Sequence, residues 1–130
     1  IRDSANNLLA QAQNFSRMAD ISVTTEIRCQ DFLLNPEELI EMSGEQDLLF
    51  LPLNPPYGQR LAKSSGGEVI YKNLGKSLRT CAQLRKIAGY VICPDEPTWR
   101  CIQMALGAER TQTHHFSHGG NDTRLVVFRT

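Results

Sequence analysis

Hydrophobic and polar residues follow an order along the chain that predicts alternating helices and strands. Residues 48–53 and 87–93 are short apolar runs, which is typical of strands buried on both faces of a parallel sheet. Polarity alternates at 23–29, 111–116 and 124–129, which predicts three more strands. Helical spacing of apolar residues predicts the intervening helices. They span 5–18, 35–42, about 15 residues through 69–84, and 94–106.

Residues at the ends of these segments support the helix boundaries. Asn35 followed by Pro36 predicts one helix start, and Pro94-Asp95-Glu96-Pro97 predicts another. Gly107 is placed to end the second of these helices. Trp99 is expected to pack in the core. The predicted inner face of the helix through 69–84 consists of Val69, Leu74, Leu78 and Leu84.

Helices that alternate with strands indicate an α/β protein with a doubly wound, mostly parallel sheet. The last two strands follow one another directly through the turn at 119–122, so they are expected to form an antiparallel pair. The connection 64–67 is expected to be a flexible loop because it reads Ser-Ser-Gly-Gly. No internal repeat is visible.

Composition narrows the class of protein. With 130 residues, 41% of them hydrophobic and 22% charged, the chain is expected to form a single globular domain, residues 1–130. No apolar run reaches the roughly 18 residues of a membrane span, and the first residues lack a signal-peptide pattern, which favours a cytoplasmic protein. The four cysteines show no C-x-x-C spacing, so free buried thiols are expected rather than disulfides or a zinc site. They are Cys29, Cys81, Cys93 and Cys101.

Charge is unevenly distributed although the net charge is zero. Residues 20–47 are acidic, with Arg28 as their only arginine or lysine, whereas residues 60–86 are basic and contain only one acid, Glu68. The basic residues are Arg60, Lys63, Lys72, Lys76, Arg79, Arg85 and Lys86. This segment could follow a phosphate backbone, or it could be the solvated face of an amphipathic helix. The sequence leaves both interpretations open.

The stretch Asn54-Pro55-Pro56-Tyr57-Gly58 directly follows an apolar predicted strand and has the chemistry to orient an exocyclic amine. The lone pair of such an amine is delocalised into its ring, so a catalyst must hold both N–H bonds. Asn54 offers a side-chain oxygen and Pro55 a backbone carbonyl, while the paired prolines keep the segment extended. Tyr57 can stack on a base. A Pro-Pro turn that merely closes a strand is the structural alternative.

This pentapeptide resembles motif IV of the class I, S-adenosylmethionine-dependent amino-methyltransferases of Rossmann-like fold. Later segments are similar to the THUMP-associated methylases that modify guanine N2 in large-subunit ribosomal RNA, a family also described as N6-adenine-specific methylases. These segments are 57–61, 70–75, 106–110 and 124–128. The resemblance implies S-adenosylmethionine as cofactor and RNA as partner, with DNA possible. It implies that the catalytic residues are Asn54, Pro55, Pro56 and Tyr57, and that the substrate contacts are Tyr57, Gly58, Arg60, Lys72 and Lys76.

The same resemblance places Asp31 beside the cofactor's adenine, with Phe32 as a wall of that pocket, Asn54 near the methyl group and Asp3 as a weaker candidate for the ribose hydroxyls. The glycine-rich loop that would hold the methionine part is not recognisable. The chain therefore resembles the C-terminal two-thirds of the domain. Because the family's strand order is 3-2-1-4-5-7-6, strands 1 and 2 are expected to come from an upstream segment or a companion chain.

Other activities use the same motif, so adenine N6 in DNA or RNA and a protein glutamine amide remain alternative substrates. A non-catalytic scaffold that lost its cofactor loop is a third reading. His114, His115 and His118 form the one metal-like cluster, but adjacent histidines on a strand point to opposite faces. No metal site is expected there, since structural zinc generally takes a fuller ligand set.

Overall fold

A computed structural model describes residues 31–55, 66–107, 110–118 and 120–130, together with five single positions near the N-terminus. The chain divides into two compact units, Ile1–Asp31 and Phe32–Thr130. In the first unit five described residues between positions 7 and 17 are helical and exposed, as the prediction of a helix at 5–18 requires. These residues are Asn7, Ala10, Gln11, Asn14 and Arg17. The predicted strand at 23–29 lies outside the described residues.

The second unit contains a four-stranded mixed sheet. Its strands are β1 (Leu48–Leu53), β2 (Lys86–Cys93), β3 (Arg110–His118) and β4 (Asn121–Arg129). Their order across the sheet is β1-β2-β4-β3, with β1 parallel to β2 and β4 antiparallel to both of its neighbours. This corresponds to the 4-5-7-6 part of the strand order that the family resemblance implies, and the predicted α/β fold with its C-terminal antiparallel pair is confirmed.

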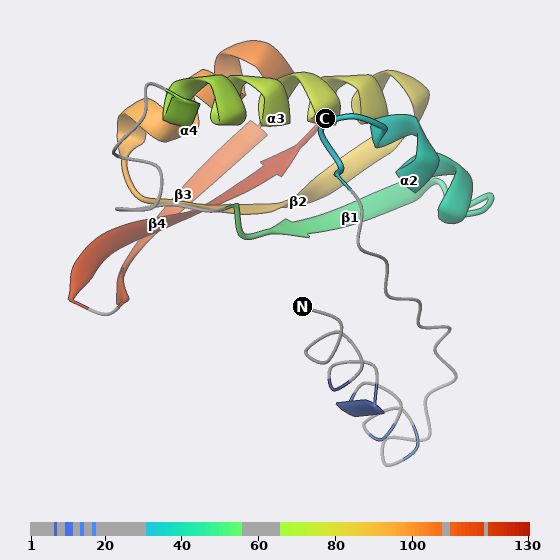
Figure 1. Ribbon diagram of the computed structural model, residues 1–130, viewed down its shortest axis with the longest axis horizontal. Helices are drawn as coiled ribbons and strands as arrows, with labels where there is room; N and C mark the ends of the chain where they lie inside the picture. The colour runs from blue at the N-terminus through green and yellow to red at the C-terminus, as the bar shows by residue number, and fades with distance from the viewer. Residues whose placement is uncertain are drawn as a thin grey trace. The chain divides into compact units, whose positions relative to one another are not determined.

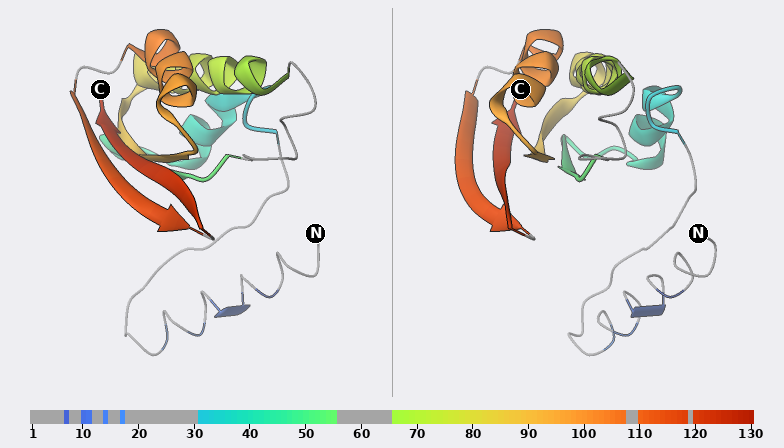
Figure 2. Two further views of the ribbon diagram at one scale, coloured as in Figure 1. Left: turned by 90° about the vertical axis from the view of Figure 1, so that its left-hand side faces the viewer. Right: turned by 60° about the vertical axis from the view of Figure 1, so that its left-hand side comes forward.

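Three helices of this unit lie on one side of the sheet (Figures 1 and 2). They are α2 (Pro36–Met42), α3 (Gly66–Leu84) and α4 (Glu96–Leu106). α3 and α4 pack against each other and against β2, while α2 packs beside α3. In the core between the helices and the sheet, several residues have no solvent exposure: Leu78, Ile87, Val91, Ile102 and Val126. No described helix is both long and apolar enough to cross a membrane.

α3 differs from its prediction in length and in its buried face. It begins at Gly66, so Gly66 and Gly67 belong to the helix and not to a loop. Leu74 and Leu78 are buried as expected, but Val69 and Leu84 are each 56% exposed. A helix repeats every 3.6 residues, so Tyr71, Leu74, Leu78 and Cys81 share the inner face and leave Val69 and Leu84 outside it.

The start and end of α4 are as the sequence predicts. The Asp95 side chain accepts a hydrogen bond of 2.8 Å from the Thr98 N–H, and Gly107 adopts a left-handed φ of 69° at the C-terminal end. Trp99 is 3% exposed, as expected of a core residue. α2 also begins where expected, but the side chain of Asn35 makes no capping bond. Asn35 thus occupies the N-cap position without stabilising it through its side chain.

The prediction that both apolar strands are buried on both faces is wrong for the described part of the molecule. In β2 the helix-facing residues are buried and the alternate ones are half-buried, apart from exposed Lys86. In β1 only Leu51 is buried, while Leu48 and Phe50 are 46% and 59% exposed. The reason is that no described element of this unit covers the sheet face opposite the helices (Figure 1). On that face the rings of Phe50 and Tyr90 pack edge to face, with their centroids 6.3 Å apart.

Candidate functional site

Asn54 and Pro55 follow directly on β1, so the strand sets their position. β1 and β2 are parallel and Leu53 pairs with Val91, which brings the carboxyl ends of both strands to one edge of the sheet. In open α/β sheets this edge is where ligands bind. Asn54 is exposed there and Pro55 is half-buried, and no described residue hydrogen-bonds the Asn54 amide. The two acceptors predicted from the motif are therefore at the correct edge, and the Asn54 side chain is available.

The close approach of β1 to β2 sets where β1 ends at the edge of the sheet, and therefore where Asn54 lies. Gly89 of β2 pairs with Leu51 of β1. A Cβ at Gly89 would lie 2.0 Å from the Leu51 carbonyl oxygen, so only glycine fits this contact. Asn54 follows Leu51 by three residues. Gly89 is thus a positioning residue that the sequence pattern did not single out.

The other predicted site residues are only partly placed. Pro56, Tyr57, Gly58 and Arg60 lie outside the described residues, as does Asp3. Asp31 is exposed and is the last residue of the first unit, and its contact with the cofactor stays a prediction. Phe32 is half-buried and packs against the hydrophobic core of the second unit. Among the described residues, the structure places Asn54 and Pro55 at the carboxyl edge of the sheet. Their catalytic role and the cofactor contacts stay predictions.

Charged side chains gather at the same edge, where β2 leads into α4. Glu96 accepts a hydrogen bond from Arg124 of β4 and also meets Arg100 at 3.4 Å, one helical turn along α4. The Glu96–Arg124 pair joins the start of α4 to β4. No sequence signal pointed to it, because the two residues are 28 positions apart. Its role is to hold the edge together, and neither residue is free to act on a ligand.

Two cysteines near these elements are unreactive because burial keeps their thiols protonated. Cys93, at the end of β2, and Cys81, in α3, are both free and fully buried. Burial raises the pKa of the Cys93 thiol to about 12, with the charges of Asp95 and Glu96 adding to the effect. Burial also raises the pKa of Cys81 to about 11. The expectation of buried structural thiols is confirmed for these two, whereas Cys101 is free and half-buried.

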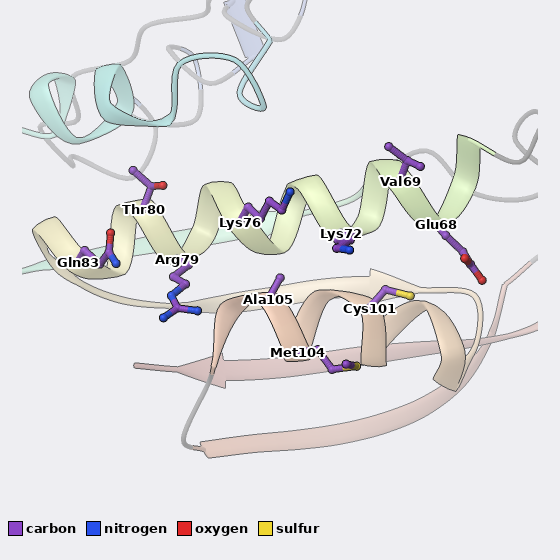
Figure 3. A pocket seen from close by; sticks show the side chains of 10 residues that line it. All are labelled: Glu68, Val69, Lys72, Lys76, Arg79, Thr80, Gln83, Cys101, Met104 and Ala105. Carbon is purple, nitrogen blue, oxygen red and sulfur yellow. The ribbon is translucent and has the colours of Figure 1, made fainter.

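The basic segment separates into residues with different surroundings. Arg85 donates hydrogen bonds to Ser43 Oγ at 2.7 Å and to the Gly44 carbonyl at 2.6 Å, so it joins the end of α3 to the end of α2. Lys72 and Lys76 are exposed on α3 and line a groove between α3 and α4 (Figure 3). Asn54 is not among the residues that line this groove. The structure therefore does not bring the two lysines into one site with Asn54.

The histidine cluster lies on the edge strand β3. His114 pairs with Leu125 and His115 with Arg124, so the two neighbouring side chains take opposite faces of the strand. Both are exposed. Among the described residues no group of three potential metal ligands comes together.

Comparisons with known proteins support the fold. No protein-family model matches the chain, and no curated protein does. A solved structure of a possible methylase from Clostridium difficile 630 is similar over 87% of this chain, with 21% identity and a TM-score of 0.57. A candidate methyltransferase, SMU.472, solved in complex with SAH, is similar over 65%, with 21% identity and a TM-score of 0.47. The chain spans 26% and 20% of these two proteins. The likeness with the TM-score of 0.57 shows the fold alone, which is an α/β fold with a Rossmann-like sheet.

Proposed function

We propose that this chain is part of a catalytic domain that transfers a methyl group from S-adenosylmethionine to an exocyclic amino group of a nucleobase. The observation that carries the proposal is the position of Asn54 and Pro55. They offer two acceptors, side by side in the chain, at the carboxyl edge of the sheet. The SAH complex of SMU.472 is consistent with this chemistry, since SAH is the product left by S-adenosylmethionine after methyl transfer.

The chemical role of this pair follows from the amine. The Asn54 side-chain oxygen and the Pro55 carbonyl each accept one amine N–H, which turns the nitrogen lone pair toward the incoming methyl group. Tyr57, by its resemblance to the family motif, stacks on the base. With S-adenosylmethionine bound beside it, the amine so oriented would form a bond to the methyl carbon as the carbon–sulfur bond breaks, and its proton would pass to solvent. Position and orientation supply most of the rate enhancement.

The cofactor pocket needs residues beyond the second unit. In the resemblance Asp31, Phe32 and Asp3 contact the cofactor, but the glycine-rich loop is not recognisable in the sequence. β1 has no strand partner on its outer edge among the described residues, and it exposes Leu48 and Phe50. An upstream segment or companion chain that pairs with β1 would cover this edge. The same segment would bring the cofactor loop to Asn54.

Guanine N2 in ribosomal RNA is the substrate that the family resemblance favours. The test is transfer of a labelled methyl group, measured in the protein with its cofactor loop present, to a panel of ribosomal RNA, DNA and glutamine-containing peptides. Methylation of RNA at guanine is the expected result. Transfer to adenine or to a glutamine amide would keep the chemistry and replace the substrate. If that protein does not bind the cofactor, the non-catalytic scaffold is the remaining interpretation.

Asn54→Ala tests the catalytic assignment. The loss of one positioned acceptor is expected to lower kcat by about a hundredfold or more. Cofactor affinity, measured by isothermal titration, should stay nearly unchanged because Asn54 acts on the amine. Asn35→Ala is the matched control, since Asn35 is also exposed and its side chain makes no capping bond. Turnover equal to that of the control would remove Asn54 from the mechanism.

A further inference from the structure

A groove of about 780 Å³ runs between α3 and α4 on the outside of the helix layer (Figure 3). Two kinds of side chain line it. Lysine and arginine side chains come from α3, and small or apolar residues come from both helices. The lining residues include Lys72, Lys76 and Arg79 of α3 and Cys101, Met104 and Ala105 of α4. The groove therefore combines a cationic side with an apolar base.

The cations form a regular stripe. Lys72, Lys76 and Arg79 are spaced i, i+4 and i+7, so their Cα atoms are separated by about 6 and 10.5 Å along the helix axis. All three are exposed, and none forms an ion pair with a described residue. Among the described lining residues Glu68 is the one acid, and it lies in the first turn of α3. The stripe is thus a predominantly positive surface, and Glu68, one helical turn before Lys72, partly offsets its charge at that end.

The apolar part of the groove is unusually accessible. Met104 of α4 is 85% exposed and Val69 of α3 is 56% exposed. Cys101 and Ala105 lie beside Met104 on α4, whereas Val69 projects from the side of α3 that faces away from α4 (Figure 3). Methionine adapts its shape to different partners, so an exposed methionine in a groove suits a protein ligand. None of the described residues that line the groove is aromatic, so these residues offer no platform on which nucleic-acid bases could stack.

We propose that this groove binds an acidic amphipathic helix of a partner protein. Charge complementarity carries the choice of partner: glutamates spaced i, i+4 and i+7 would meet the three cations of α3. Leucine-type residues on the adjoining stripe would cover Met104 and Ala105 of α4 (Figure 3). Asn54 does not line the groove, so binding of such a helix does not depend on methyl transfer.

The test uses a fluorescent synthetic helix with glutamate at the three stated positions and leucine beside them, titrated with the chain and followed by anisotropy. We expect saturable binding that weakens as salt is added, because exposed ion pairs are screened. Lys76→Glu should weaken binding about fivefold at low salt. Lys86→Glu is the matched control, because Lys86 is exposed and lies outside the groove. A peptide with lysine in place of the facing glutamate should recover binding to the Lys76→Glu variant.

A second variant distinguishes a helical peptide from a nucleic acid as the ligand of the groove. Met104→Gln keeps the charge and changes an exposed position, so folding should be unaffected; circular dichroism checks this. Peptide affinity should fall about tenfold in Met104→Gln. Unsaturable binding, or an equal loss in Lys86→Glu, would overturn the proposal. So would tight RNA binding that depends on Lys76 and not on Met104, with no peptide bound. Self-association of the chain that Lys76→Glu abolishes would instead assign the groove to a second copy.

Discussion

Replacing Gly89 with alanine should disturb both the sheet and the candidate site. The new Cβ would lie 2.0 Å from the Leu51 carbonyl oxygen, which is 1.4 Å less than the 3.4 Å at which ordinary contacts begin. Because the obstacle is backbone, no side chain can rotate away, and β1 must move from β2. Overpacking of this kind costs about 3 kcal/mol. The lower entropy of alanine in the unfolded chain returns about 0.5–1 kcal/mol.

The net loss of about 2–2.5 kcal/mol corresponds to a fall in Tm of about 10–20 °C for a unit of this size. Thermal melts followed by far-ultraviolet circular dichroism measure it. Ala88→Val adds volume one residue earlier on the same strand, on the uncovered face, and should leave Tm nearly unchanged. Turnover should also fall, by up to about a hundredfold, because β1 carries Asn54. A Gly89→Ala variant that melts within about 4 °C of wild type would refute the close-contact argument.

Two further predictions concern the helix packing and the buried thiols. Gly75→Ala should lower stability by about 1–2 kcal/mol despite the better helix propensity of alanine, because its Cβ would lie 2.5 Å from the Ile102 carbonyl oxygen and 2.8 Å from Ala105 Cβ. Urea unfolding checks this, and an added Ala105→Gly change should restore part of the loss. The raised pKa values of Cys81 and Cys93 mean that the folded state holds these protons more tightly. Their contribution to stability should be complete below about pH 9 and be lost as pH rises through 11 to 12. A variant with both cysteines changed to alanine should show a smaller alkaline loss; an equal loss would contradict the assignment.

Local chemistry made part of the fold predictable from the sequence. Asp95 and Gly107 bound α4 where the sequence placed them, because a capping carboxylate and a left-handed glycine act on neighbouring backbone. The bounds of β1 were also predicted, and with them the position of Asn54 at the carboxyl edge. These features depend on a few adjacent residues. That is why they could be read without knowledge of the tertiary structure.

Features that depend on a partner element could not be read in this way. Val69 belongs to an apolar pattern in the sequence, yet it is exposed because the inner face of α3 is set by Tyr71 and Leu74. Gly75 and Gly89 look like ordinary glycines until the opposing backbone of α4 or β1 is in place. The groove exists only because α3 and α4 lie side by side. The cofactor contacts fall largely on residues outside those described, so they remain predictions.

The position of β4 between β2 and β3 has a consequence for how the protein is made. β4 contributes Val126 and Phe128 to the core and joins β3 to the rest of the sheet. During synthesis β3 can gain no neighbour in the sheet until β4 has emerged from the ribosome, and the Ala88–Arg129 pair closes a long loop of chain. Until then the edge of β2 that pairs with β4 has no strand partner, and it is open to strands of other nascent chains. A chaperone that shields β2 for that interval should raise the yield of folded protein.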